Sequence, residues 1–98
     1  MKRTRLRERS DKMKQAYRRR SVFVASFLQL SPLCQMKLEG CQSRAVDVDE
    51  LIRRSHGGAI YPDQPDKREN HYFALCRSCH DFKTTHPEWA RTNGWEER

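Results

Sequence analysis

Four cysteines in two pairs constrain this chain more than any other feature of its sequence. Six residues separate Cys34 from Cys41, and two separate Cys76 from Cys79. With 98 residues, of which 36% are apolar and 34% charged, the chain cannot bury a large core, and domains of this size commonly need a cross-link or a metal ion. Two pairs of thiolates predict an all-cysteine zinc site that closes tetrahedrally. Binding the ion would contribute about 10–16 kcal/mol to folding.

The run Cys76-Arg77-Ser78-Cys79-His80 also fits two other kinds of site, a haem attachment and a redox dithiol. Haem attachment needs export, yet the N-terminal residues contain no apolar segment typical of a secretory signal. It would also leave Cys34 and Cys41 unused. A redox dithiol is expected beside a βαβ pattern, which this chain is too short and polar to form. We therefore expect zinc, in a reducing cytoplasm, with His80 outside the zinc sphere.

The positive charge of the chain is concentrated at its N-terminus. Residues 1–20 carry a net charge of +8, whereas residues 21–98 carry −1. This imbalance predicts a basic arm that binds nucleic acid by releasing counterions, and Arg18, Arg19 and Arg20 are its candidate DNA contacts. A solvated tail is the simpler alternative. No run of 18 apolar residues is present, so no membrane span is expected.

The order of expected elements indicates an α+β fold. Residues 1–12 are expected to be disordered and 12–30 helical, although residues 22–30 are apolar enough for a strand. Strands are predicted near residues 44–50 and at 71–75, and helices at 78–84 and 87–93. The chain then divides into a basic arm and helix, residues 1–30, and a zinc-stapled domain, residues 31–98.

Two carboxylates precede a turn and could approach His80 across a short strand pair. Asp49 or Glu50 together with His80 would bind a divalent cation and leave positions for water and phosphate oxygens. The alternative is that His80 only forms a hydrogen bond with a zinc thiolate.

Two stretches, CQMKLEGCQSRAVDVDELIRRSHGGAI and NHYFALCRSCHDFKTTHPEWARTNGW, resemble the HNH endonucleases, particularly the small phage and actinobacterial proteins. The resemblance covers a little over half of the chain and implies a ββα-metal fold that hydrolyses DNA phosphodiester bonds or nicks one strand. It implies that Asp49 and His80 hold one catalytic cation (Mg²⁺, Mn²⁺ or Ni²⁺), and that Asn70 pins the loop of the general base. It also implies a phage packaging (terminase) or recombination component as partner.

The chain departs from the family at Glu50, where most members have the histidine that activates water. Glu50 could itself be the base, or it could be a second metal ligand and leave His56 as the base. A third alternative is an inactive, zinc-stabilised module that only binds nucleic acid. Arg53 and Arg54, just beyond the acids, are expected to clamp flanking phosphates.

Overall fold

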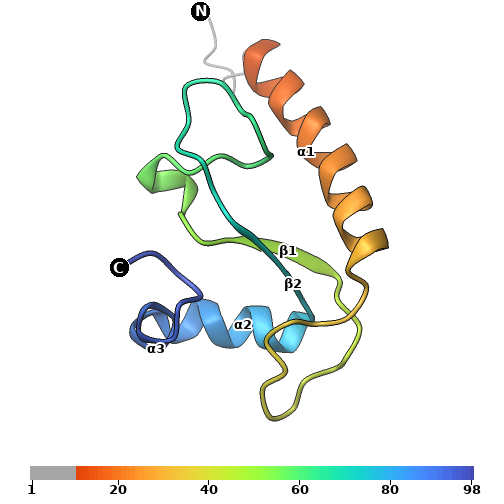
Figure 1. Ribbon diagram of the computed structural model, residues 1–98, viewed down its shortest axis with the longest axis vertical. Coiled ribbons are helices and arrows are strands. Elements are labelled where there is room, and N and C mark those ends of the chain that lie inside the picture. The colour runs from red at the N-terminus through yellow and green to blue at the C-terminus, as the bar shows by residue number, and fades with distance from the viewer. Residues whose placement is uncertain (1–10) are drawn as a thin grey trace, which may run out of the picture.

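The computed structural model describes residues 11–98 and shows a small α+β fold (Figure 1). Disorder was predicted for residues 1–12. Residues 1–10 lie outside the described part of the chain, whereas Asp11 and Lys12 are helical, so the prediction was wrong for these two residues. A long helix is followed by two short strands and two short helices, as the sequence predicted. The elements in chain order are α1 (Asp11–Leu30), β1 (Asp47–Glu50), the 3-10 turn η1 (Arg54–His56), β2 (Tyr72–Leu75), α2 (Arg77–Thr85) and α3 (Pro87–Thr92). Across residues 11–98 no helix is long and apolar enough to cross a membrane.

The two strands form an antiparallel pair whose two faces carry different side chains. Val48 pairs with Ala74, and Asp49 pairs with Phe73. Because side chains alternate along a strand, Asp49 and Phe73 lie on one face, while Val48 and Glu50 lie on the other. Figure 1 shows α1 and α2 on opposite sides of the strand pair. Each helix therefore contacts a different set of strand residues.

Helix α1 lies against the Glu50 face of the sheet. Its apolar residues recur every three or four positions, and the helix ends where Ser31 precedes Pro32. Phe23 packs edge-on against Tyr72, with 4.7 Å between the ring centroids. None of the α1 residues is fully buried, so apolar packing alone holds this helix weakly.

Arg20 provides the polar attachment of α1 to the sheet. Its guanidinium lies 2.8 Å from a Glu50 carboxylate oxygen and donates hydrogen bonds to the carbonyl oxygens of Ile60 and Val48, at 2.8 Å and 3.0 Å. The Arg20 and Glu50 side chains are only 16% and 11% exposed. Arg20 was expected to contact DNA, but here its donors are directed into the protein, so it is not placed to bind a phosphate.

We expect Arg20→Ala to destabilise the protein by roughly 3 kcal/mol, because the substitution leaves a shielded carboxylate and two carbonyl groups without their donor. Urea denaturation would measure the change. The matched control is Arg19→Ala, since Arg19 is the exposed neighbour on the same helix. Equal stability of the two variants would contradict an attachment through Arg20.

Helices α2 and α3 close the other face of the sheet. Cys76 caps α2, because its sulfur accepts a hydrogen bond from the backbone N–H of Cys79, and Pro87 begins α3. Trp95 packs edge-on against Phe73 at 4.9 Å. Among residues 11–98, the largest fully buried side chains are those of Leu75, Cys34, Cys76 and Cys79. The core of this domain is therefore built around sulfur rather than around a large apolar cluster.

Candidate metal centre and adjoining cleft

The four cysteines meet at the end of the sheet, although they come from two distant segments. Cys34 and Cys41 belong to the loop between α1 and β1, whereas Cys76 and Cys79 lie at the start of α2. The loop is held beside β2 by a hydrogen bond from the Gln35 N–H to the Ala74 carbonyl, 2.8 Å long. The isolated bridge between Leu33 and Arg44 closes the base of the loop.

The sulfur atoms are close enough to hold one metal ion. All four Sγ atoms lie within 4.8 Å of one another, and none is in a disulfide. The Sγ atoms of Cys41 and Cys76 are 3.8 Å apart, which matches the edge of about 3.8 Å expected for a tetrahedron with metal–sulfur bonds of about 2.3 Å. The cluster is thus compatible with structural zinc, as the sequence predicted.

Backbone donors surround the sulfur of Cys76. It accepts hydrogen bonds from the N–H groups of Gln42 and Cys79, at 3.3 Å and 3.4 Å. Burial raises the pKa of this thiol, but the backbone donors outweigh burial and lower the pKa to about 6. Burial and the neighbouring thiols raise the pKa of Cys79 to about 12. Four crowded thiols cannot all ionise easily without a cation among them.

Asp49 and His80 come together one helical turn from the cysteines. The carboxylate of Asp49 points from β1 toward α2, and its Oδ2 atom is 3.9 Å from the Nε2 atom of His80. The other ring nitrogen, Nδ1, is buried and has no hydrogen-bond partner among the described residues; the nearest carboxylate oxygen, that of Asp81, is 3.7 Å away. One carboxylate and one imidazole thus face each other, as ligands of a divalent cation would.

Lys83 is a third member of this cluster, and the sequence analysis missed it. Its ammonium group lies 3.0 Å from the same Asp49 oxygen and donates a hydrogen bond to the Glu50 carbonyl at 2.9 Å. The Lys83 side chain is only 6% exposed. Because Lys83 follows His80 by three positions, both project from one face of α2, and that spacing was the signal that could have identified it.

The carboxylate of Glu50 is directed away from that of Asp49, although both residues line the cavity described below. The Glu50 carboxylate pairs with Arg20 on the α1 side of the sheet, because adjacent strand residues point in opposite directions. Burial raises the pKa of Glu50 above its ordinary value, and the Arg20 guanidinium offsets only part of this effect. Burial, with the nearby Glu50 charge, likewise raises the pKa of Tyr72 on this face to about 12.

Asn70 pins the loop that follows β1. Its side-chain oxygen accepts from the Ile52 N–H at 2.8 Å, and its amide donates to the carbonyl oxygens of Ile52 and Ala59, at 2.9 Å and 3.0 Å. Gly58 makes this close approach possible, since a Cβ atom there would lie 2.1 Å from the Ile52 carbonyl oxygen. Asn70 therefore holds Ile52 and Ala59, at the two ends of this loop, close together.

A cavity of about 440 Å³ opens beside Asp49 and Lys83. Arg53, held at 2.9 Å by Glu96, and Arg54, 3.2 Å from the Tyr17 hydroxyl, both line it. Its lining residues are Asp49, Glu50, Arg53, Arg54, Ser55, Lys83, Thr84 and Glu96. His56 is exposed on η1 but is not among them. Both arginines therefore line this cavity. His56 does not, but it directly follows Ser55, which does.

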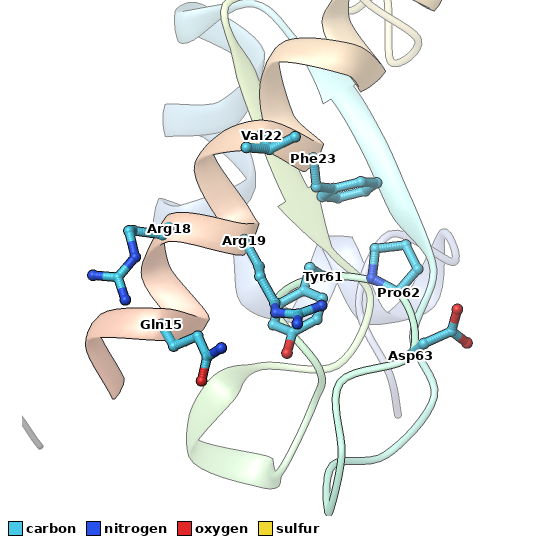
Figure 2. Close-up of a pocket in the computed structure, with 8 residues that line it drawn as sticks. All are labelled: Gln15, Arg18, Arg19, Val22, Phe23, Tyr61, Pro62 and Asp63. Carbon is cyan, nitrogen blue, oxygen red and sulfur yellow. The ribbon is translucent and has the colours of Figure 1, made fainter. Parts of the chain in front are cut away.

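Arg18 and Arg19 remain exposed on α1, unlike Arg20. They line an open groove of about 610 Å³ between α1 and the Tyr61-Pro62-Asp63 segment (Figure 2). This groove shares no lining residue with the cavity beside Asp49, and it was not predicted from the sequence.

Fold and site together define a small α+β protein with a four-cysteine cluster that could hold a metal ion. Comparison of the chain with protein-family models, with curated proteins and with solved structures found no match.

Proposed function

We propose that this protein is a zinc-stabilised, metal-dependent DNA endonuclease or nickase of the HNH kind. The observation that carries the proposal is the convergence of Asp49 and His80, 3.9 Å apart, on one face of an antiparallel strand pair packed against a helix. The four-cysteine cluster supports a structural zinc ion beside that pair. Asp49 and His80 would hold the single catalytic cation (Mg²⁺, Mn²⁺ or Ni²⁺).

Positively charged side chains around the cavity beside Asp49 could bind a phosphate. A bound divalent cation would supply Lewis acidity toward a phosphate oxygen and stabilise negative charge as it develops. Lys83 holds the Asp49 carboxylate in place through its 3.0 Å ion pair and adds positive charge to the site. Arg53 and Arg54 line the same cavity and can position the DNA backbone, which gives affinity without sequence specificity.

The two candidates for the base that activates water, Glu50 and His56, differ in their surroundings. A general base must reach the attacking water. Glu50 lines the cavity beside Asp49, but its carboxylate is held by Arg20 on the α1 side of the sheet. His56 is exposed on the turn that contributes Arg54 and Ser55 to the cavity. Because the Glu50 carboxylate is already paired with Arg20, we propose His56 as the base and Glu50 as the attachment of α1.

A catalytically inactive nucleic-acid-binding module is the second candidate, because each acidic group of the site already has a cationic partner. Glu50 is paired with Arg20, and Asp49 is paired with Lys83. If Lys83 replaces the divalent cation rather than assisting it, the site would bind phosphate without cleaving it. In either case, a phage packaging (terminase) or recombination component stays the expected partner.

The test of the proposal is nicking of supercoiled plasmid by the zinc-loaded protein. We expect conversion to open-circular DNA when Mg²⁺, Mn²⁺ or Ni²⁺ is added, and none in buffer freed of divalent ions by a resin, which leaves the tightly held zinc in place. Failure to nick with any of the three ions, together with intact DNA binding, would select the binding module.

Two substitutions separate the candidate bases in the same assay. We expect His56→Ala to lower the nicking rate by roughly 10²–10⁴-fold, the usual loss for a general base, and Glu50→Gln to change it much less. Glu50→Gln retains an oxygen acceptor for Arg20, so α1 stays attached. If Glu50→Gln lowered the nicking rate more than His56→Ala does, Glu50 would be the base.

A further inference from the structure

The groove beside α1 combines cationic and aromatic side chains. Arg18 and Arg19 project from α1. Figure 2 shows Arg19 directed toward the side that carries Tyr61 and Pro62, and Arg18 on the outer side of the helix. Val22, 69% exposed, adds an apolar contact on the helix. The groove is lined by Gln15, Arg18, Arg19, Val22, Phe23, Tyr61, Pro62 and Asp63. The groove thus places arginine side chains beside apolar and aromatic side chains. Solvation of the arginines alone does not require aromatic neighbours.

The groove continues into a second cavity along the same helix. Arg19 and Tyr61 line both spaces, and the second, of about 280 Å³, adds Lys12 and Pro65. From Lys12 to Phe23 the helix rises by about 16 Å, which corresponds to roughly five stacked nucleotides. Lys12, Arg18 and Arg19 line the two spaces together with the carboxylate of Asp63. Lys12 is paired with Asp66 at 3.4 Å, which leaves Arg18 and Arg19 as the cations available to a ligand.

We propose that this groove binds a short unpaired stretch of nucleic acid, with a base stacked on Tyr61 and its phosphates on Arg18 and Arg19. Sites for single strands combine these two features, a cationic track and aromatic rings that accept any base. The groove is open to solvent and, at about 610 Å³, has room for a single base. Duplex DNA, whose bases are stacked inside, would contact only the arginines.

This site is separate from the Asp49 cleft. Helix α1 lies on the Glu50 face of the sheet, whereas Asp49 faces α2. Binding in the groove needs no divalent cation, so it can be measured without cleavage. Single-strand binding in the groove can therefore be tested independently of nuclease activity.

Fluorescence anisotropy with a labelled oligothymidylate and with a duplex of equal length tests the proposal, using full-length zinc-loaded protein and no added divalent ion. We expect Tyr61→Leu to weaken binding of the single strand roughly tenfold, the usual cost of losing one stacked base, and to change duplex binding less than twofold. Tyr61→Phe, which keeps the ring, should bind the single strand within twofold of the unchanged protein. Arg18→Ala combined with Arg19→Ala should weaken both ligands and flatten the salt dependence.

The exposed Arg44 provides a charge control, because Arg44→Ala removes one positive charge from the loop between α1 and β1, outside the groove. An unchanged single-strand affinity in Tyr61→Leu would overturn the proposal, as would an equal loss for single strand and duplex. A second measurement needs no variant: photo-crosslinking of a bromouracil-containing oligonucleotide to the unchanged protein should label the peptide that contains Tyr61. Labelling elsewhere only would also overturn it.

Discussion

Asp49→Asn is expected to lower the rate of plasmid nicking by at least about 10²-fold, the usual loss when a group that stabilises transition-state charge is removed. The substitution removes the negative charge that would hold the catalytic cation, but it retains an oxygen that can accept from Lys83, 3.0 Å away. The fold and the zinc content should therefore be unchanged. Titration calorimetry with Mn²⁺ would show the loss of cation binding directly, without reliance on activity.

Asp47 supplies the matched control for this experiment. It lies on the same strand and the same face as Asp49, and its carboxylate is 3.3 Å from the Arg77 guanidinium rather than near His80. Asp47→Asn removes the same charge and should leave nicking within about twofold of the unchanged protein. His80→Ala should behave like Asp49→Asn. An equal loss in the Asp47 and Asp49 variants would mean that general electrostatics, rather than a cation site, governs activity.

Loss of the metal at the cysteine cluster is expected to unfold the described domain. Cys76→Ser removes one ligand and also the sulfur that caps α2. Structural zinc contributes about 10–16 kcal/mol of binding free energy, which equals or exceeds the total stability of about 5–15 kcal/mol of an ordinary domain. Atomic emission should find one zinc ion per chain in the unchanged protein, and circular dichroism should show no cooperative melting for Cys76→Ser.

Ser78→Ala is the control for the cysteine experiment. Ser78 lies between Cys76 and Cys79, and its backbone N–H, which the substitution keeps, donates to the Gln42 side chain at 3.1 Å. This variant should bind zinc and melt as the unchanged protein does. A Cys76→Ser protein that retained a cooperative transition would show that apolar packing alone supports the fold.

Local patterns determined the secondary structure of this protein. The three-four spacing of apolar residues predicted α1, and its end before Pro32 follows from the steric conflict between proline and the preceding residue. The helix that begins at Pro87 likewise follows from local stereochemistry, and Gly94, at φ 82°, lies just beyond its end. These signals act over a few residues, so they can be predicted without the fold.

The cysteine cluster was also predictable, although its ligands come from distant segments. Thiols have few other uses in a chain with so small a core, and the spacing within each pair fits a single ion. The proximity of Asp49 to His80 followed from the strand pair and from the position of His80 one turn after Cys76.

The tertiary structure alone decided what surrounds each charged side chain. Asp49 and Glu50 are adjacent and chemically alike, but strand alternation directs Asp49 to His80 and Lys83, and Glu50 to Arg20. Arg18, Arg19 and Arg20 form one basic run in the sequence, yet the 100° turn per helical residue places only Arg20 against the sheet. Composition records how many charges a chain carries, whereas the packing of α1 and α2 on opposite faces determines which of them meet.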